Sequence, residues 1–184
     1  MTCILAFDTA GPYCAAALLK DVDVVTKSEE MARGQAERLM TMLQEFLQDN
    51  STSWADLTAI GVGIGPGNFT GIRIGVAAAK GLSMGLSIPL HGVDGFEQRK
   101  RLGLAPVISA PRQQIYIFDH GVPRMISSQN SSLAPSQPDP DQIARAIAED
   151  TVARGLDAPN PAAPLYIKPA DAAPARDSAP PIFP

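Results

Sequence analysis

The feature that most constrains this chain is a glycine-rich stretch in which an apolar, strand-like run gives way to a helix. The stretch reads Gly63-Ile-Gly-Pro-Gly-Asn-Phe-Thr-Gly71-Ile-Arg-Ile-Gly-Val-Ala-Ala-Ala-Lys80. Glycines permit backbone angles that a Cβ forbids, and the free amides at the start of a helix favour negative charge. Such an elbow either binds an anion such as phosphate or lets a strand and a helix pack closely. Its spacing matches neither the dinucleotide-binding fingerprint nor the P-loop, which favours packing.

The hydrophobic pattern around this elbow predicts a mixed sheet crossed by helices. Three strands come first, then helices alternate with strands, in the order β-β-β-α-β-α-β. The expected strands are 3–7, 13–19, 22–26, 58–64 and 88–93, and the expected helices are 33–48 and 70–85. We expect residues 1–97 to form a complete first lobe carrying two pairing helices.

The second half of the chain is less regular and predicts a smaller second lobe, residues 98–184. Expected elements are a short charged helix over 94–102, strands at 106–109 and 114–118, and a helix over 139–154. The segment 170–184 is rich in proline and alanine, which do not supply a packed element.

Charge and cysteine content exclude several function classes. The chain carries 15 basic and 19 acidic residues, a formal net charge of −4, so no global basic field favours nucleic acid. Its two cysteines, Cys3 and Cys14, have no metal-ligand spacing and indicate a reducing, cytoplasmic setting. No apolar run approaches the roughly 20 residues of a membrane span, so we expect neither export nor anchoring.

Small residues form a stripe along the helix that follows the elbow. Gly71, Gly75, Ala78, Gly81 and Gly85 recur at steps of three or four residues. A face of this kind allows another helix to approach closely. Two interpretations stay open: the stripe packs within the subunit, or it receives a helix of a partner.

Several motifs together resemble the bacterial TsaB (YeaZ) family. They are Asp8-Thr9, Gln35-Ala-Glu-Arg-Leu39, Gly65-Pro-Gly-Asn-Phe-Thr-Gly-Ile-Arg73 and Pro89-Leu-His-Gly-Val93, all in the first lobe. The resemblance implies an α/β, actin-like ATPase (ASKHA, ribonuclease H-like) fold with a complete first lobe and a reduced second lobe. It implies a non-catalytic subunit of the machinery that forms N6-threonylcarbamoyladenosine in tRNA. The implied partners are a TsaD-type carbamoyltransferase and a TsaE-type ATPase, with a homodimer when alone and tRNA reached through the complex.

The chain departs from the catalytic TsaD paralogue where that protein carries a His-x-x-x-His metal pair. Gly95 and Arg99 occupy these two positions, and neither is a metal ligand. We therefore expect no catalytic residue and no metal. His91 and His120 stand alone and are interpreted as structural or surface residues. Arg99, Lys100 and Arg101 are interpreted as a solvated basic helix face.

The candidate site residues fall into two groups. The predicted partner interface comprises Glu37, Met40, Leu43, Gly71, Arg73, Gly75, Ala78 and Leu82, and the predicted vestigial nucleotide loop comprises Asp8, Thr9, Gly65, Gly67, Asn68 and Thr70. Asp8 is interpreted as a turn-capping carboxylate, with a metal-linked role as the alternative. Arg73 has two candidate ligands, a carboxylate across the interface or a phosphate.

Two functions remain open at this point. The first is a scaffold subunit without a cofactor, or with weak ATP or ADP binding at the subunit interface. The alternative is an ATP-binding phosphotransferase or ATPase that uses the elbow and Asp8 on phosphate. In the second lobe only Arg112 and Tyr116 match the family pattern, and Lys168 replaces an arginine in the closing segment Pro164-Leu-Tyr-Ile-Lys-Pro169.

Overall fold

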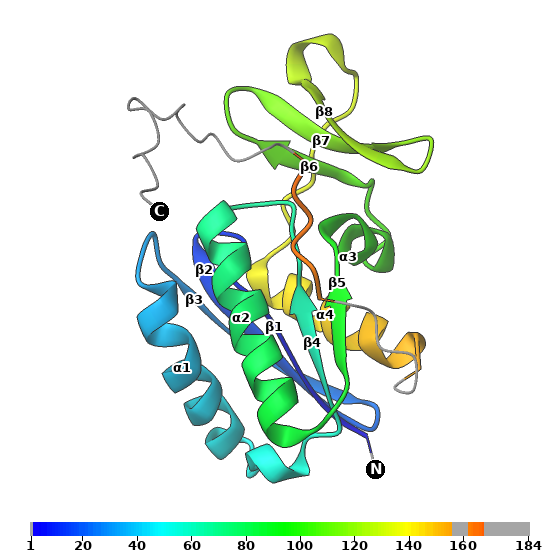
Figure 1. Cartoon of the computed structure of the whole chain (residues 1–184). Helices are drawn as coiled ribbons and strands as arrows, with labels where there is room; N and C mark the ends of the chain where they lie inside the picture. The colour runs from blue at the N-terminus through cyan, green and yellow to red at the C-terminus, as the bar shows by residue number, and fades with distance from the viewer. Residues whose placement is uncertain (1, 156–161, 168–184) are drawn as a thin grey trace, which may run out of the picture.

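The computed structural model describes residues 2–155 and 162–167, and its centre is a five-stranded mixed sheet (Figure 1). The strand order is β3-β2-β1-β4-β5. Strands β1, β2 and β3 pair antiparallel, whereas β4 and β5 continue the sheet parallel to β1. The bounds are β1 (Cys3–Asp8), β2 (Tyr13–Lys20), β3 (Asp23–Glu30), β4 (Ala59–Gly63) and β5 (Leu90–Val93). The predicted order of elements in the first lobe is confirmed.

Two helices cover one face of this sheet and a third covers the other (Figure 1). Helices α1 (Gln35–Asp49) and α2 (Phe69–Leu86) lie on the first face, where Leu39, Leu43 and Phe46 of α1 join the core beneath them. Helix α4 (Pro140–Ala153) lies on the second face and buries Ile143 and Ile147. The sheet is therefore an internal layer, which explains why β1 and most of β2 are continuously apolar.

A smaller antiparallel sheet lies beyond the carboxyl ends of β4 and β5, with α3 (Gly95–Arg101) between the two sheets (Figure 1). Its strands are β6 (Val107–Ala110), β7 (Gln114–Asp119) and β8 (Val122–Ser127), and single-turn helices span Trp54–Asp56 and Ser128–Asn130. Asp94 caps α3 by accepting hydrogen bonds from the amides of Phe96 and Glu97. Strand β8 was not predicted from the sequence.

The chain then returns to the central sheet twice. Helix α4, which lies within the range expected to form the second lobe, packs against β1, β2, β3 and β4. The later segment 162–167 runs beside β4, where the amide of Leu165 donates to the carbonyl of Ile64 at 2.8 Å. Ala162 is buried in the core under α1 and α2, whereas Leu165 and Ile167 pack on Phe96, Ile108 and Tyr116 between α3 and the small sheet.

Parts of the sequence-based expectations fall outside the described residues. These are the segment 170–184 and the replacement at Lys168. Within the described ranges, no helix is long and apolar enough to cross a membrane.

Candidate functional site

The glycine elbow joins β4 to α2 and is tied to the turn after β1. Gly65 has φ of 93°, a left-handed conformation that favours glycine. Asn68 begins α2 as its N-cap, and its side chain accepts a hydrogen bond from the amide of Gly71 at 2.8 Å. The Asn68 amide donates to the carbonyl of Ala10 at 2.7 Å. The elbow and the turn 8–10 are therefore joined directly.

Close approach, which only glycine allows, brings α2 onto that turn. A Cβ at Gly71 would overlap the carbonyl oxygen of Thr9, and a Cβ at Gly75 would lie 2.7 Å from Thr9 Oγ1. The Thr9 hydroxyl in turn donates to the carbonyl of Gly71 at 2.7 Å. The packing interpretation of the small-residue stripe is confirmed for Gly71 and Gly75, which contact their own subunit.

Asp8 ends β1 as a buried carboxylate that caps the turn. Its side chain is 2% exposed, and Oδ1 accepts a hydrogen bond from the Ala10 amide at 2.5 Å. Burial raises the pKa of Asp8 to about 6, because desolvation disfavours the charged form; the Ala10 amide, Gln98 and Arg99 oppose this rise. The turn-capping interpretation of Asp8 is confirmed.

A pocket of about 490 Å³ opens beside Asp8, where β1, β4 and β5 end. Its walls come from the turn after β1, the elbow, α3, β6 and the segment that leads into α4. The lining side chains that carry chemistry are Asp8, Tyr13, Glu30, Gln98, Arg99 and Asp139. Asp8, Gly65 and Gly67 of the predicted nucleotide loop meet at this pocket.

The other members of the predicted nucleotide loop lie elsewhere. Thr9 is buried under α2, and Asn68 and Thr70 are exposed. These last two residues line a separate hollow of about 410 Å³ beside Arg33 and Glu37, at the starts of α1 and α2. The structure thus divides the predicted loop between two sites.

Arg99 is buried, so its interpretation as part of a solvated basic face is wrong. It is 7% exposed, donates from Nη1 to the Gly95 carbonyl at 3.0 Å and from Nη2 to the Ser136 carbonyl at 3.2 Å. Its Nε has no hydrogen-bond partner among the described residues. Burial lowers the pKa of Arg99, and Tyr13 and Asp8 raise it. Lys100 is exposed, and Arg101 pairs with Asp150 at 3.1 Å.

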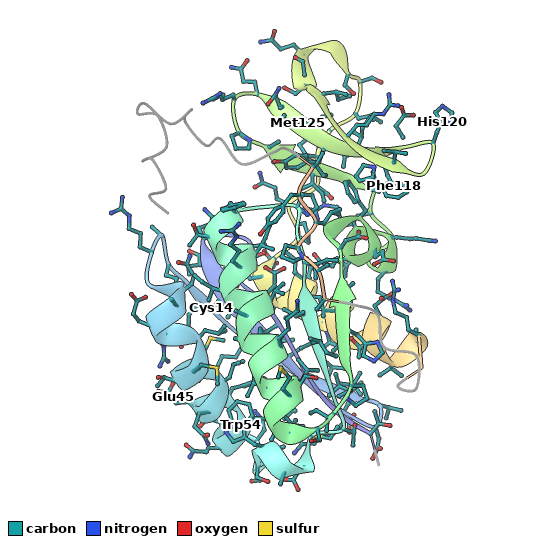
Figure 2. All side chains as sticks on the ribbon, viewed as in Figure 1. Cys14, Glu45, Trp54, Phe118, His120 and Met125 are labelled. Atoms are coloured by element: carbon teal, nitrogen blue, oxygen red, sulfur yellow. The ribbon has the colours of Figure 1, made fainter. Side chains whose placement is uncertain are left out.

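Neither histidine lines the pocket beside Asp8. His91 on β5 is fully buried, and neither ring nitrogen has a partner among the described residues. Burial lowers the pKa of His91, and the nearby charge of Arg154 lowers it further. His120 is exposed at the β7–β8 turn beside Asp119 (Figure 2). Within residues 2–155 and 162–167, no group of three or more His, Cys, Asp or Glu side chains could hold a metal.

The outer faces of α1 and α2 form a second candidate site. Glu37, Met40 and Arg73 are exposed, and Ala78 and Leu82 are half-buried. A shallow groove lies between α1, the end of α2 and Trp54. Trp54 lies near the end of α1 (Figure 2), and its indole donates to Gln44. The groove is lined by Met40, Thr41, Gln44, Glu45, Gln48, Trp54, Leu82 and Leu86.

Three members of the predicted interface lie inside the subunit instead. Leu43 is fully buried in the core, and Gly71 and Gly75 are covered by Thr9. Gly81 and Gly85, in contrast, have no atoms within 4 Å of where a Cβ would stand. Met84 beside them is 81% exposed. The open part of the small-residue stripe is thus the second half of α2.

An ion-pair network joins α1 to β3. Arg38 of α1 donates to Glu29 of β3 and to Glu45, which lies two turns further along α1. Each carboxylate receives two nitrogen–oxygen contacts of 2.6 to 3.0 Å. Hydrogen bonds from Arg38 lower the pKa of both carboxyl groups. Met40 lies outside the buried apolar face of α1 and is exposed.

Arg73 contacts two aromatic rings of its own chain. Its guanidinium lies 3.9 Å from the centroid of Phe69, and its Nε donates to the Tyr166 hydroxyl at 2.9 Å. The rings of Phe69 and Tyr166 are 4.9 Å apart. Arg73 and Tyr166 both stand in motifs that resemble the family, but their spacing in the sequence does not reveal the contact between them.

Comparisons with known proteins identify the family of this chain. The family model of TsaD, described as tRNA N6-adenosine threonylcarbamoyltransferase, matches residues 26–170. TsaB of Escherichia coli is 42% identical over 90 residues, 49% of this chain and 39% of that protein. TsaB of Bacillus subtilis is 32% identical over 143 residues, 71% of this chain and 62% of that protein. The matched regions thus span less than two thirds of these two relatives.

A solved structure extends the likeness over nearly the whole fold. YeaZ from Pseudomonas aeruginosa superposes with a TM-score of 0.69 at 23% identity, covering 90% of this chain and 100% of that chain. The shared feature at this level of identity is the α/β fold.

Proposed function

Because the chain belongs to the TsaD family, in its TsaB/YeaZ group, we propose that it is a non-catalytic pairing subunit of the assembly that forms N6-threonylcarbamoyladenosine in tRNA. The observation that carries the proposal is the outer face of α1 and α2. This face offers exposed apolar side chains and open glycines, whereas the core beneath it is already filled.

The proposed partner is a TsaD-type carbamoyltransferase that presents equivalent helices. Met40 and Leu82 line the groove, and Gly81 and Gly85 leave room for a partner helix to approach closely. An exposed apolar face of this kind is typical of a protein–protein contact. Leu43, Gly71 and Gly75 support the face from inside, while Glu37, Arg73 and Ala78 flank it.

Three further partners belong to the same proposal. A TsaE-type ATPase joins the pair, and a second copy of this chain occupies the α1–α2 face when the carbamoyltransferase is absent. tRNA is reached through the complex, because a chain of net charge −4 does not by itself favour a phosphate backbone.

The test places a bulky residue on the open half of α2. Gly81→Trp puts a side chain into free space, so the monomer keeps its fold, and tryptophan is a better helix former than glycine. We expect this variant to lose at least tenfold in affinity for the TsaD-type subunit, measured by calorimetry on the purified proteins. The matched control is Val152→Trp, an exposed position on α4, which covers the opposite face of the sheet.

The two readouts separate pairing from catalysis. Reconstituted tRNA modification is expected to fall with pairing in Gly81→Trp and to remain at the wild-type rate in Val152→Trp. Wild-type affinity in both Gly81→Trp and Met40→Asp would refute the proposed surface. Full modification activity without pairing would refute the role itself.

An ATP-dependent phosphotransferase is the second candidate, because Asp8, Gly65 and Gly67 line one pocket. Calorimetry with ATP and magnesium, combined with a phosphate-release assay on the isolated chain, tests it. Turnover that Asp8→Asn abolishes would favour the enzyme over the pairing subunit.

A further inference from the structure

The pocket beside Asp8 holds two buried charged groups of opposite sign. Asp8 is 2% exposed and Arg99 is 7% exposed, and both line the same cavity of about 490 Å³. Each group influences the other electrostatically across this space. Asp8 accepts hydrogen bonds from the Ala10 amide and from the Gln98 side chain, and Arg99 donates to two carbonyl oxygens.

Arg99 supplies the observation that points to a ligand. Its Nε–H has no partner among the described residues, although the side chain is more than nine-tenths buried. A buried donor without an acceptor costs about 1–3 kcal/mol, and more where the group is charged. An acceptor brought into the pocket by a ligand, with a small movement of the guanidinium, would remove this cost.

The other charges of the pocket define what the ligand carries. Besides Asp8, the lining contains Glu30 and Asp139, both exposed at the rim, and Arg99 is the cationic side chain of the lining described. Three carboxyl groups disfavour a polyphosphate, and the cation at the base disfavours a simple polyamine. A molecule that carries one carboxylate together with ammonium groups suits both.

We propose that this pocket binds a free α-amino acid, with its carboxylate on Arg99, its α-ammonium on Asp8, and a basic side chain directed to Glu30 and Asp139. The size supports this assignment, since small-molecule sites typically measure about 300–1,000 Å³ and combine a few fixed polar groups with an apolar lining. Here Ile108, Ile143 and the prolines 66, 138 and 140 supply the apolar wall. The inference is independent of the pairing role, because the groove of α1 and α2 shares no lining residue with this pocket.

The experiment uses L-lysine as the probe and the full chain as the receptor. Isothermal titration calorimetry is expected to show saturable binding of L-lysine, at least tenfold weaker for L-lysine amide, which lacks the carboxylate, and for Nα-acetyl-L-lysine, which lacks the α-ammonium. Arg99→Gln is expected to weaken binding at least tenfold. Affinity for the TsaD-type subunit stays unchanged throughout, so failure here is distinguishable from failure of the pairing proposal.

A rim variant keeps the proposal testable if Arg99→Gln does not fold. Glu30 is exposed and lies at the end of β3, so Glu30→Gln preserves the fold and is expected to weaken L-lysine binding severalfold. Absence of saturable L-lysine binding would overturn the proposal. So would equal affinity for L-lysine amide, tighter binding of spermidine, or tighter binding of ATP with magnesium that depends on Arg99.

Discussion

Asp8 gives a prediction whose size follows from its burial. In the fold the carboxyl has a pKa of about 6 instead of 3.8, so between these values the folded state binds more protons than the unfolded state. Stability contributed by this group is therefore present at low pH and is lost as the pH rises through about 6. The difference between these two pKa values, at about 1.36 kcal/mol per pKa unit, corresponds to a loss of about 3 kcal/mol in the free energy of unfolding at neutral pH.

The substitution Asp8→Asn isolates this cost. Asparagine keeps an oxygen for the Ala10 amide but carries no charge, so the variant avoids the penalty for burying a carboxylate. At pH 7.5 we expect Asp8→Asn to be more stable than wild type by about 3 kcal/mol, or roughly 6–12 °C in Tm. At pH 3.5 the two proteins are expected to have the same stability, because Asp8 is then protonated in wild type.

Urea unfolding monitored by circular dichroism at a series of pH values measures the difference directly. The control is Asp23→Asn, which removes an exposed carboxylate at the start of β3 and is expected to change stability by less than about 0.5 kcal/mol at either pH. A pH-independent difference between Asp8→Asn and wild type would refute the reasoning. Lower stability of Asp8→Asn at pH 7.5 would refute it as well.

Two further predictions concern buried positions of the same lobe. His91 has a lowered pKa in the fold, so wild type is expected to lose stability as the pH falls below about 6.5, and His91→Leu is expected to reduce that loss in urea unfolding at pH 5 and 7.5. Gly71→Ala places a Cβ against the Thr9 carbonyl and is expected to cost about 1–3 kcal/mol, whereas Gly81→Ala is expected to gain about 0.5–1 kcal/mol. Equal effects of the two alanine substitutions on Tm would contradict the packing of α2 on the turn.

Local patterns were sufficient to predict the central sheet and the two helices on its first face. Apolar runs and helical periodicity predicted all five strands of the central sheet and both helices on its first face, because these elements bury continuous or periodic apolar faces. Strand β8 was missed because Pro123 and Arg124 interrupt its apolar pattern. It forms through its register with β7, where Tyr116 faces Met125, and no local signal encodes that pairing.

The site residues that sequence reasoning misjudged depend on contacts between distant segments. Arg99 resembles an ordinary surface arginine because Lys100 and Arg101 follow it. Its burial involves Ser136, which the chain reaches only after the whole small sheet. The spacing of Gly71 and Gly75 correctly predicted a helical face without side chains. That this face packs on its own subunit follows from the position of Thr9, which covers both glycines. Periodicity identifies the face of a helix, and the neighbour that covers it is decided by tertiary structure.

The late position of α4 in the chain also affects how the protein is made. The five strands of the central sheet are complete at Val93, but the helix that covers their second face ends at Ala153. At the usual elongation rate of about 5–20 residues per second, the ribosome needs roughly 3–12 s to add these residues. During that time Ala15, Ala17 and Leu19 of β2 lack their cover. A nascent chain that stalls in this interval presents an apolar sheet face to chaperones, and slow codons between β5 and α4 would lengthen that exposure.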